Sequence, residues 1–397
     1  MATIEKRIRN GETSYRARYR TPAGVQRSKV FTRKIDAERF LTTVEAAKLT
    51  GAFIDPALSK ATVREWAHQW LDGQAHVKPT TYARYEGIVR KHLDPVWGHV
   101  PLGKVTHADV QAWITAVSKS HSPSSVRKMH RVLSLVLDMA VKDGRLVRNV
   151  AKGVNLPRPI KHEHRYLTHA QVDALADAIA HPTDVSKHVP LADRQRDTYR
   201  LIVLFLAYTG LRWGEMAALR VGRLQFARRR AVIIESVTPV AGQGLVWGTP
   251  KTHQRREVPI PRFLLADLEA HVHGKTSDQL VFTGVRGGEV LRVSTFSAAL
   301  ATAAQAIGVP GLHPHELRHT AASLAIAAGA DVKVVQQMLG HASATMTMDT
   351  YGHLFEDRLD EISDAMDAAR EANRYRLASA AQLGVSEPNS PGSEDRR

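Results

Sequence analysis

The chain has 397 residues, of which 43% are hydrophobic and 24% charged, and it contains no cysteine. This composition is that of a globular protein and excludes a disordered chain, while the lack of cysteine excludes disulfides, cysteine-ligated zinc and thiol catalysis. Lys and Arg outnumber Asp and Glu by 55 to 39, giving a net charge of +16, which favours a polyanionic partner, nucleic acid before an anionic membrane.

The length predicts two or three domains. Residues 1–10 are charged and have no apolar run, so no secretory signal is visible. No apolar stretch approaches the roughly 18 residues that a membrane span requires. We therefore expect a cytoplasmic protein of a bacterial host, associated with the nucleoid and not with a membrane.

Residues 1–55 are expected to form a small DNA-binding domain. Residues 15–20 alternate tyrosine or alanine with arginine, which is the period of a strand buried on one face. Residues 3–8 and 25–31 supply two further strands, and residues 36–48 supply an amphipathic helix. The alternation places three arginines on the outer face of the sheet: Arg16, Arg18 and Arg20. Such a face suits a DNA groove; the alternative is a solvated edge strand blunted by charge.

Residues 60–157 are predicted to be an all-helical domain. Val63 to Leu71 carry apolar side chains at helical spacing, and Thr106 with Asp109 resembles a capping box at the start of another helix. A longer helix begins after Ser122. Its outer face presents basic side chains that either follow DNA phosphates or are simply solvated: Arg127, Lys128 and Arg131.

Residues 156–162 contain two prolines and a cationic run, which predicts a stiff, extended connector to the next domain. Residues 165–376 mix helices with two strand-like segments, 231–237 and 257–260, that flank Lys251. The fold class is therefore multidomain, mainly α with small β-sheets (α+β). It comprises a small three-stranded sheet with a helix, a helical domain and a mixed α/β domain.

The last residues, 377–397, are predicted to be a disordered tail, since Ser, Pro, Glu and Gly are abundant there. Before the tail, apolar residues recur at helical spacing along an otherwise acidic helix: Leu354, Phe355, Leu359, Ile362 and Met366. These side chains either pack on their own domain or dock on a neighbouring protomer.

The third domain contains the side chains needed to cut a phosphodiester without a metal. That reaction needs a nucleophile, a proton donor for the leaving oxygen, and cations on the non-bridging oxygens. Arginine suits the last role because its planar fork pairs with two oxygens and keeps its charge. Arg212 stands at the start of a helix. Arg318 follows His315 by three residues, so His315 and Arg318 project from one side of a helical turn.

This set resembles the tyrosine recombinases, the phage integrase family. The resemblance rests on Gly210-Leu211-Arg212-x-x-Glu215, Lys251, His315-x-x-Arg318-His319, Leu339-Gly340-His341 and Tyr351. Their order and spacing match the family from about residue 165 to 360, with Glu316 where the family usually shows Asp. Residues 1–55 resemble the arm-site-binding domain of the three-domain integrases of phages and integrative conjugative elements, and residues 60–157 resemble their core-site-binding domain.

The resemblance implies a role for each matching residue. Arg212 and Arg318 would clamp the scissile phosphate and stabilise the charge that develops on it. Tyr351 would attack the phosphorus, leaving a 3′-phosphotyrosyl link, and Lys251 would protonate the departing 5′ oxygen. His315 would act as general base toward the tyrosine hydroxyl, or would orient it.

Three further residues complete the implied catalytic domain. His341 would hydrogen-bond a phosphate oxygen, Glu215 would support the arginines, and His319 would lie behind the residues that touch the phosphate. Because the covalent link conserves the energy of the broken bond, the resemblance implies no ATP, cofactor or metal.

The implied function is site-specific DNA recombination by an integrase that inserts and excises a mobile element such as a viral genome. The implied partners are double-stranded attachment sites, three further copies of the chain in a homotetramer, a host bending factor and an excisionase. One alternative is a recombinase that resolves chromosome dimers or plasmids, but such enzymes are typically built of the last two domains alone. Another is a non-catalytic DNA-binding relative, against which the complete set of catalytic residue types argues.

A remote alternative is a zinc metalloprotease, because residues 315–319 also fit the H-E-x-x-H pattern. In those enzymes the pattern lies inside a buried helix. Here loop-forming residues precede it, and Pro314 suits the first turn of a helix, so the pattern opens its helix instead. A protease would also leave Arg212, Lys251 and the net charge unexplained.

Overall fold

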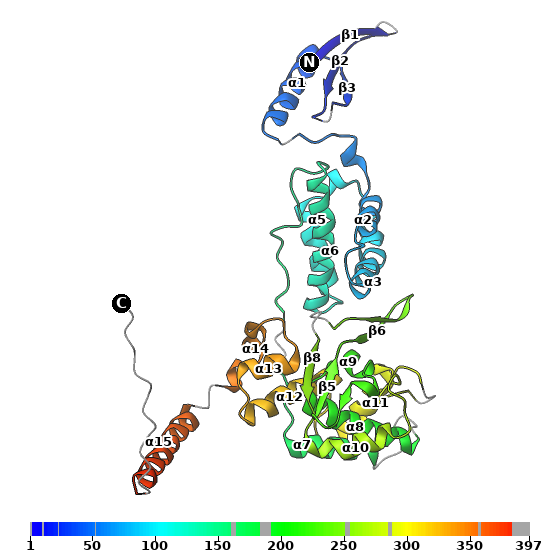
Figure 1. Ribbon diagram of the computed structural model, residues 1–397. Coiled ribbons are helices and arrows are strands. Elements are labelled where there is room, and N and C mark those ends of the chain that lie inside the picture. The colour runs from blue at the N-terminus through cyan, green and yellow to red at the C-terminus, as the bar shows by residue number, and fades with distance from the viewer. Residues whose placement is uncertain are drawn as a thin grey trace, which may run out of the picture. The chain divides into compact units, whose positions relative to one another are not determined.

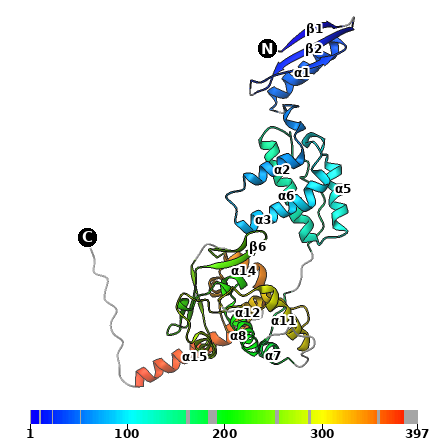
Figure 2. The ribbon, with the colours of Figure 1, turned by 90° about the vertical axis from the view of Figure 1, so that its right-hand side faces the viewer.

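The structure is a computed structural model of the chain. It describes residues 2–9, 12–22, 24–51, 53–159, 164–182, 192–250, 255–284, 288–355 and 359–382. The chain divides into two compact units, Met1–His162 with Pro239–Gly244, and Glu163–Thr238 with Leu245–Arg397. Figures 1 and 2 show the secondary structure of both units. None of the helices in the described ranges is long and apolar enough to cross a membrane.

The first unit begins with an antiparallel sheet in the order β1-β2-β3 and one helix (Figure 1). These elements are β1 (Thr3–Arg9), β2 (Glu12–Arg20), β3 (Gln26–Phe31) and α1 (Lys34–Leu49). Ala17 and Tyr19 of β2 are buried with Ala37, Leu41 and Val44 of α1 in a small apolar core. The predicted sheet, its helix and the inward direction of these two strand residues are confirmed.

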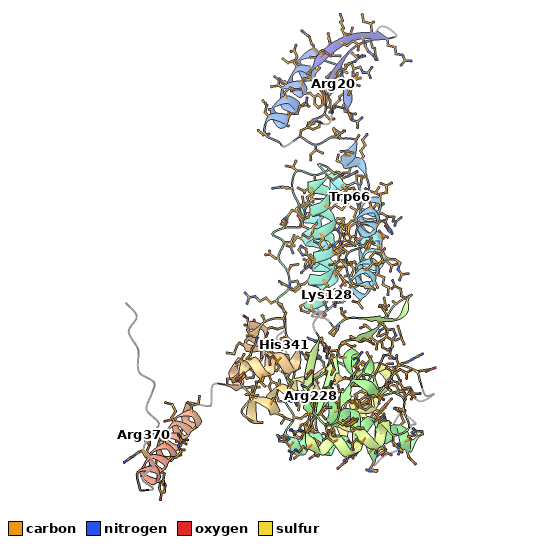
Figure 3. All side chains as sticks on the ribbon, in the orientation of Figure 1. Arg20, Trp66, Lys128, Arg228, His341 and Arg370 are labelled. Carbon is orange, nitrogen blue, oxygen red and sulfur yellow. The ribbon has the colours of Figure 1, made fainter. Side chains whose placement is uncertain are left out.

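A helical bundle makes up most of the rest of the first unit. Its elements are η1 (Leu58–Lys60), α2 (Val63–Asp72), α3 (Pro79–Ile88), the π-helical turn η2 (Val89–Leu93), α4 (Asp94–Trp97), η3 (Leu102–Lys104), α5 (His107–Ser118) and α6 (Pro123–Lys142). Trp66, labelled in Figure 3, lies in the bundle core, where its Nε1 donates to the carbonyl of Val136 at 3.1 Å. The predicted capping box at Thr106 is confirmed, and Ser122 accepts a hydrogen bond from the Ser125 amide as the N-cap of α6.

The second unit mixes helices with two small sheets. Its helices are α7 (His169–Ala180), α8 (Asp193–Thr209), α9 (Trp213–Ala217), η5 (Val221–Arg223), η6 (Arg262–Leu264), α10 (Leu265–Val272), α11 (Val293–Ala306), α12 (Pro314–Ala327), α13 (Val332–Leu339), α14 (Ala344–Tyr351), η7 (Gly352–Leu354) and α15 (Leu359–Gln382). Its strands are β4 (Leu224–Gln225), β5 (Arg230–Ile233) and β8 (Arg256–Pro259), and two further strands have residues in both units: β6 (Ser236–Val240) and β7 (Gly244–Gly248). One sheet has the order β4-β5-β8, and β6 pairs with β7.

Helix α8 is the centre of the second unit. Residues 201–207 are buried without interruption, as expected for a helix that is apolar on every side, and the helix packs against α7 and α12. It ends at Gly210, which adopts the left-handed conformation at φ +66°. A Cβ at Gly210 would lie 2.7 Å from Cδ2 of Leu339 and 3.2 Å from Cβ of Ala321. The missing side chain therefore lets α12 and α13 approach the turn that leads to Arg212.

Two predicted boundaries in this unit differ from the structure. The segment 231–237 was predicted as one strand, but β5 ends at Ile233 and β6 begins at Ser236, because the chain leaves the β4-β5-β8 sheet there and pairs with β7. Helix α15 continues to Gln382, so the predicted start of the tail at residue 377 lies inside this helix. Residues 383–397, the rest of the predicted tail, lie outside the described residues.

Replacing Gly210 by alanine tests this packing. We expect Gly210→Ala to lower the free energy of unfolding by about 2–5 kcal/mol, since the left-handed conformation costs about 1–2 kcal/mol and overpacking about 1–3 kcal/mol. Gly308→Ala is the matched control, because Gly308 has a φ of +76° but no atom within 4 Å of an added Cβ. Calorimetry should show a larger fall in melting temperature for Gly210→Ala. Equal falls would show that the close approach of α12 and α13 adds nothing.

Candidate active site

Arg212 lies at the N-terminus of α9 and is held by Glu215 of the same helix. Its Nη1 donates to Oε1 of Glu215 at 2.9 Å, and its backbone N–H donates to Oε2 at 3.0 Å. Its Nη2 donates to the carbonyl of Gly340 at 3.3 Å. Arg212 is therefore tied both to its own helix and to the turn that follows α13.

Arg256 of β8 binds the same carboxylate and was not among the predicted site residues. Its Nη1 and Nη2 donate to Oε1 and Oε2 of Glu215 at 3.0 and 2.6 Å. Burial would raise the pKa of Glu215, but the hydrogen bonds from Arg256 and the charges of both arginines outweigh it, so the pKa lies below its usual value. A sequence signal existed: the period of two places Arg256 on the same face of β8 as the buried Val258, where an arginine needs a partner.

Arg318 of α12 is buried, with 2% of its surface exposed. Its Nη1 donates to the carbonyl of Gly210 at 2.7 Å, and its Nη2 has no hydrogen-bond partner among the described residues. Burial and the nearby charge of Arg212 lower the pKa of Arg318 to about 9, against the attraction of Glu215, so the side chain stays charged at neutral pH. A buried charged nitrogen without a partner is costly, and an anion would satisfy it.

His341 follows the turn that ends α13 and is labelled in Figure 3. Gly340, the residue before it, has a φ of +65°. The Nδ1 of His341 lies 2.9 Å from Oγ1 of Thr347, a buried residue of α14. Burial, with the charges of Arg318 and Arg212 behind it, lowers the pKa of His341 to about 4, so the ring is neutral at pH 7.

Tyr351 is the last residue of α14 and is buried, with its hydroxyl on a histidine. Its Oη lies 2.8 Å from Nδ1 of His319, and the ring of His319 stacks on that of His164 with centroids 4.0 Å apart. Burial raises the pKa of Tyr351 to about 12, although Arg318 opposes the shift. Burial and the neighbouring His164 lower the pKa of His319 to about 3. The pair is therefore neutral at pH 7.

His315 and Lys251 complete the predicted set. His315 is exposed near the start of α12, and its ring meets that of His319 edge-on at a centroid distance of 5.1 Å. The side chain in contact with the tyrosine hydroxyl is thus His319, which the sequence placed behind the reacting groups. Lys251 lies in the segment 251–254, between β7 and β8, which is outside the described residues.

The H-E-x-x-H residues lie at the start of α12, as predicted from Pro314. Glu316 caps its own helix, because its Oε2 accepts a hydrogen bond from the backbone N–H of His313 at 2.7 Å. Arg318, a variable position in the zinc pattern, is buried and interacts electrostatically with Arg212 and Glu215. Within the part of the chain that the structure describes, no three His, Asp or Glu side chains are grouped to hold a metal ion.

The arrangement concentrates positive charge beside a tyrosine. The described side chains at this site include three arginines, Arg212, Arg256 and Arg318, and one carboxylate, Glu215. Arg256 and Arg212 share that carboxylate, whereas Arg318 has no ion-pair partner among the described residues. Neutral His341 and His319 add hydrogen-bonding groups without adding charge. Such a site is suited to an anion whose negative charge grows during a reaction.

The predicted DNA-contact residues of the first unit lie on β2 of the sheet and on α6 of the helical bundle, and they differ in exposure. On β2, Arg16 donates to Oγ of Ser28 at 3.0 Å and Arg18 pairs with Glu5 at 2.8 Å, while Arg20, labelled in Figure 3, is exposed. On α6 three basic side chains are exposed: Arg127, Lys128 (also labelled) and Arg131. Arg127 also donates to the carbonyl of Pro157 at 3.1 Å.

Comparison with known families gives two matches along this chain. Residues 165–358 match the model of the phage integrase family, and residues 62–118 match that of the phage integrase N-terminal SAM-like domain. The integrase of Mycobacterium phage FRAT1 is 29% identical over 323 residues, covering 80% of this chain and 89% of that protein.

Solved structures share the fold. The Tn1549 transposon integrase in complex with transposon right end DNA has a TM-score of 0.62 at 20% identity, covering 73% of this chain and 94% of that one. A lambda integrase tetramer bound to a Holliday junction has a TM-score of 0.55 at 17% identity, covering 86% of this chain and 96% of that one. At these identities the likeness is one of fold.

The low pKa of His319 makes a prediction about acid stability. Because its pKa falls from 6.5 to about 3 on folding, the unfolded chain binds the proton first. Its contribution to stability is therefore complete above pH 6.5 and is lost as the pH falls, by on the order of 1.4 kcal/mol per pH unit. We expect the melting temperature between pH 6.5 and 4 to fall more steeply for the wild type than for His319→Asn, which keeps a hydrogen-bonding group for Tyr351. Parallel curves would contradict the buried, neutral state of His319.

Proposed function

We propose that Tyr351 is the nucleophile of this protein and that the protein inserts and excises a mobile DNA element. The premise is that the chain belongs to the phage integrase family and is a site-specific tyrosine recombinase. The observation that carries the assignment of Tyr351 is Nη2 of the buried Arg318 beside it, which has no hydrogen-bond partner among the described residues. A scissile phosphate is an anion that can enter this site and satisfy Nη2 of Arg318. Of the nine tyrosines in the chain, Tyr351 combines burial in this cationic site with a hydroxyl held by a histidine.

The reaction exchanges one phosphodiester for another. The Oη of Tyr351 forms a bond to phosphorus, the bond from phosphorus to the 5′ oxygen breaks, and the proton of the tyrosine hydroxyl passes to a histidine. Lys251, by its resemblance to the family's general acid, protonates the departing 5′ oxygen. The 5′ hydroxyl of a partner strand then attacks the 3′-phosphotyrosyl link and releases Tyr351. The number of phosphodiester bonds is unchanged, so the steps need no ATP.

The arginines and His341 stabilise the charge that develops on the phosphate. Arg212 and Arg318 donate to its non-bridging oxygens, and each donor aimed at a developing charge contributes several kcal/mol to lowering the barrier. If Nδ1 of His341 accepts from the hydroxyl of Thr347, the Nε2–H of His341 is free to donate to a third oxygen. The neutral state of His341 is compatible with this donor role.

His319 is the residue best placed to receive the proton of Tyr351. Its Nδ1 is 2.8 Å from the tyrosine Oη, which is within the reach required of a general base. The shifted pKa values keep both groups neutral here, so the tyrosinate is not formed in this arrangement. A bound phosphate offsets the charge of the arginines and thereby raises the pKa of the histidines. His315, predicted as the base, contacts the ring of His319 and is assigned the orientation of that ring.

The other segments bring DNA and further protomers to this site. We assign residues 1–55 to arm sites, residues 60–157 to the core site, and residues 165–376 to catalysis, with Arg20 and the basic face of α6 as contacts to double-stranded DNA. A homotetramer on DNA is the proposed assembly. The side chains of Ile362 and Met366 on α15 are 54% and 69% exposed, which supports docking of this helix on a neighbouring protomer.

The basic N-terminal sheet favours an integrase over a recombinase that resolves chromosome dimers or plasmids. Its own apolar core, formed around Ala17 and Tyr19, makes it a folded module, and Arg20 on its outer face is exposed. A second DNA-binding module suits a reaction that must hold arm and core sequences at once. A host bending factor and an excisionase would then set the direction of the reaction.

Removing the tyrosine hydroxyl tests the nucleophile. We expect Tyr351→Phe to bind the element's attachment site with unchanged affinity but to form no SDS-resistant protein–DNA adduct, because the phenyl ring has no atom to bond to phosphorus. The site can be recovered from the DNA that flanks the gene. Tyr199→Phe, in a buried tyrosine of α8, is the matched control and should form the adduct like the wild type. An adduct formed by Tyr351→Phe would overturn the assignment.

Removing the N-terminal sheet tests the proposal that residues 1–55 bind arm sites while residues 60–157 bind the core site. Deletion of residues 1–55 should leave cleavage of an isolated core site intact but reduce integration between full attachment sites. The triple substitution Arg16→Gln, Arg18→Gln and Arg20→Gln should reproduce this loss without removing the folded sheet, while Lys34→Gln with Arg39→Gln on α1 removes charge elsewhere. Integration that survives the deletion would contradict an arm-site role.

A further inference from the structure

Arg256 is joined to the site by all three nitrogens of its guanidinium. Nη1 and Nη2 grip the two oxygens of Glu215, and Nε donates to the carbonyl of Met338 at 3.2 Å. Its side chain is 9% exposed, and that of Glu215 is 1% exposed. The paired geometry fixes orientation as well as charge, since a planar fork meets a planar carboxylate in one way.

The carboxylate of Glu215 connects Arg256 to Arg212. Oε1 accepts from Nη1 of both arginines, and Oε2 accepts from Nη2 of Arg256 and the backbone N–H of Arg212. A carboxylate has about four acceptor positions, and all four are used here. Without Arg256, the carboxylate would have free acceptor positions in a buried site and could rotate toward Arg212, carrying that guanidinium with it.

Arg256 also fixes the turn that carries His341. Helix α13 contacts β8, and the carbonyl bound by Nε belongs to its last turn. A Cβ at Gly340 would lie 2.9 Å from both Cδ and Nε of Arg256. The side chain of Arg256 therefore lies directly against the peptide of Gly340, whose left-handed conformation directs the chain to His341 and whose carbonyl accepts from Arg212.

We propose that Arg256 is a positioning residue for DNA strand cleavage, which holds Arg212 through Glu215 and His341 through the end of α13. This inference rests on the proposed function of the site. The fork of Arg256 is occupied by Glu215 and its Nε by Met338, so it acts through its neighbours and does not itself bind the phosphate. Arg318 differs in this respect, because its Nη2 has no hydrogen-bond partner among the described residues.

The test compares Arg256→Lys and Arg256→Met with the wild type. Arg228→Met is the matched control: Arg228, labelled in Figure 3, lies in the turn between β4 and β5 and pairs at 3.5 Å with Glu257, the neighbour of Arg256 on β8, but is 66% exposed. Each variant is assayed for melting temperature, for affinity toward attachment-site DNA, and for the single-turnover rate of adduct formation on a nicked core site. The single-turnover rate constant reports each folded, bound molecule, so a loss of folded protein alone leaves it unchanged.

We expect Arg256→Met to slow adduct formation by on the order of 100-fold, which is the cost of a misplacement of about 1 Å, with affinity changed only a few-fold. Arg256→Lys, which keeps the charge but loses the fork, should be intermediate, and Arg228→Met should match the wild type. If Arg256 acts through Glu215, adding Arg256→Lys to Glu215→Gln should slow the reaction less than it does in the wild-type background.

Two outcomes would overturn the inference and are distinct from failure of the proposed function. Unchanged rate constants in Arg256→Met and Arg256→Lys, or losses that add fully to that of Glu215→Gln, would show that Arg256 does not position the site. If Arg256→Met does not fold, the rate constants of Arg256→Lys in the wild-type and Glu215→Gln backgrounds decide alone. Failure of the proposed function would appear separately, as a wild-type protein that forms no adduct at all.

Discussion

The buried carboxylate of Glu215, shared by Arg212 and Arg256, is the interaction on which the rest of the site depends. A carboxylate taken out of water is stabilised only when its acceptor positions are filled, and here two arginines fill them from α9 and β8. The arginines are held in turn by carbonyls of α13 and the turn after it. The charge of Glu215 thus joins three elements that are far apart in the chain. It also holds Arg212 within electrostatic range of Arg318.

The positive charge that remains gives the site its chemistry. Arg318 is buried against the carbonyl of Gly210, and its Nη2 has no hydrogen-bond partner among the described residues. In the proposed reaction a phosphodiester pairs with this nitrogen, which then remains in contact as charge grows on phosphorus. Tyr351 and His319 form a neutral pair, so the proposed nucleophile is held by the histidine without being ionised.

Residues at the start of the second unit also contribute to the surroundings of Tyr351. His164, which follows the connector between the two units in sequence, stacks on His319, and Tyr166 lies 6.5 Å from Tyr351 between ring centroids. The hydroxyl of Tyr166 meets Nε2 of His353 at 3.4 Å, two residues beyond Tyr351 in the chain. The environment of Tyr351 is therefore built from both ends of the segment 164–353, with α12 between them in sequence.

The sequence by itself determined the local structure and most of the chemical groups. Alternation in residues 15–20 predicted the buried face of β2, the Thr106–Asp109 spacing predicted a capping box, and Pro314 predicted the start of α12, because each of these signals spans only a few residues. The motif predicted Arg212, Arg318, His341 and Tyr351 as a set, and the structure brings Arg212, Arg318 and His341 within electrostatic range of one another, and Arg318 within that of Tyr351.

Only the tertiary structure decided how these groups are paired. Glu215 and Arg256 are 41 residues apart, and His319 and Tyr351 are 32 residues apart, so no periodicity or cap could relate them. Arg256 and His319 acquired their places because a buried charge or polar atom is costly without a partner, and the partner comes from whichever elements pack together. The sequence predicted the candidate reacting groups, whereas packing around α8, α12 and α13 determined which residues hold them.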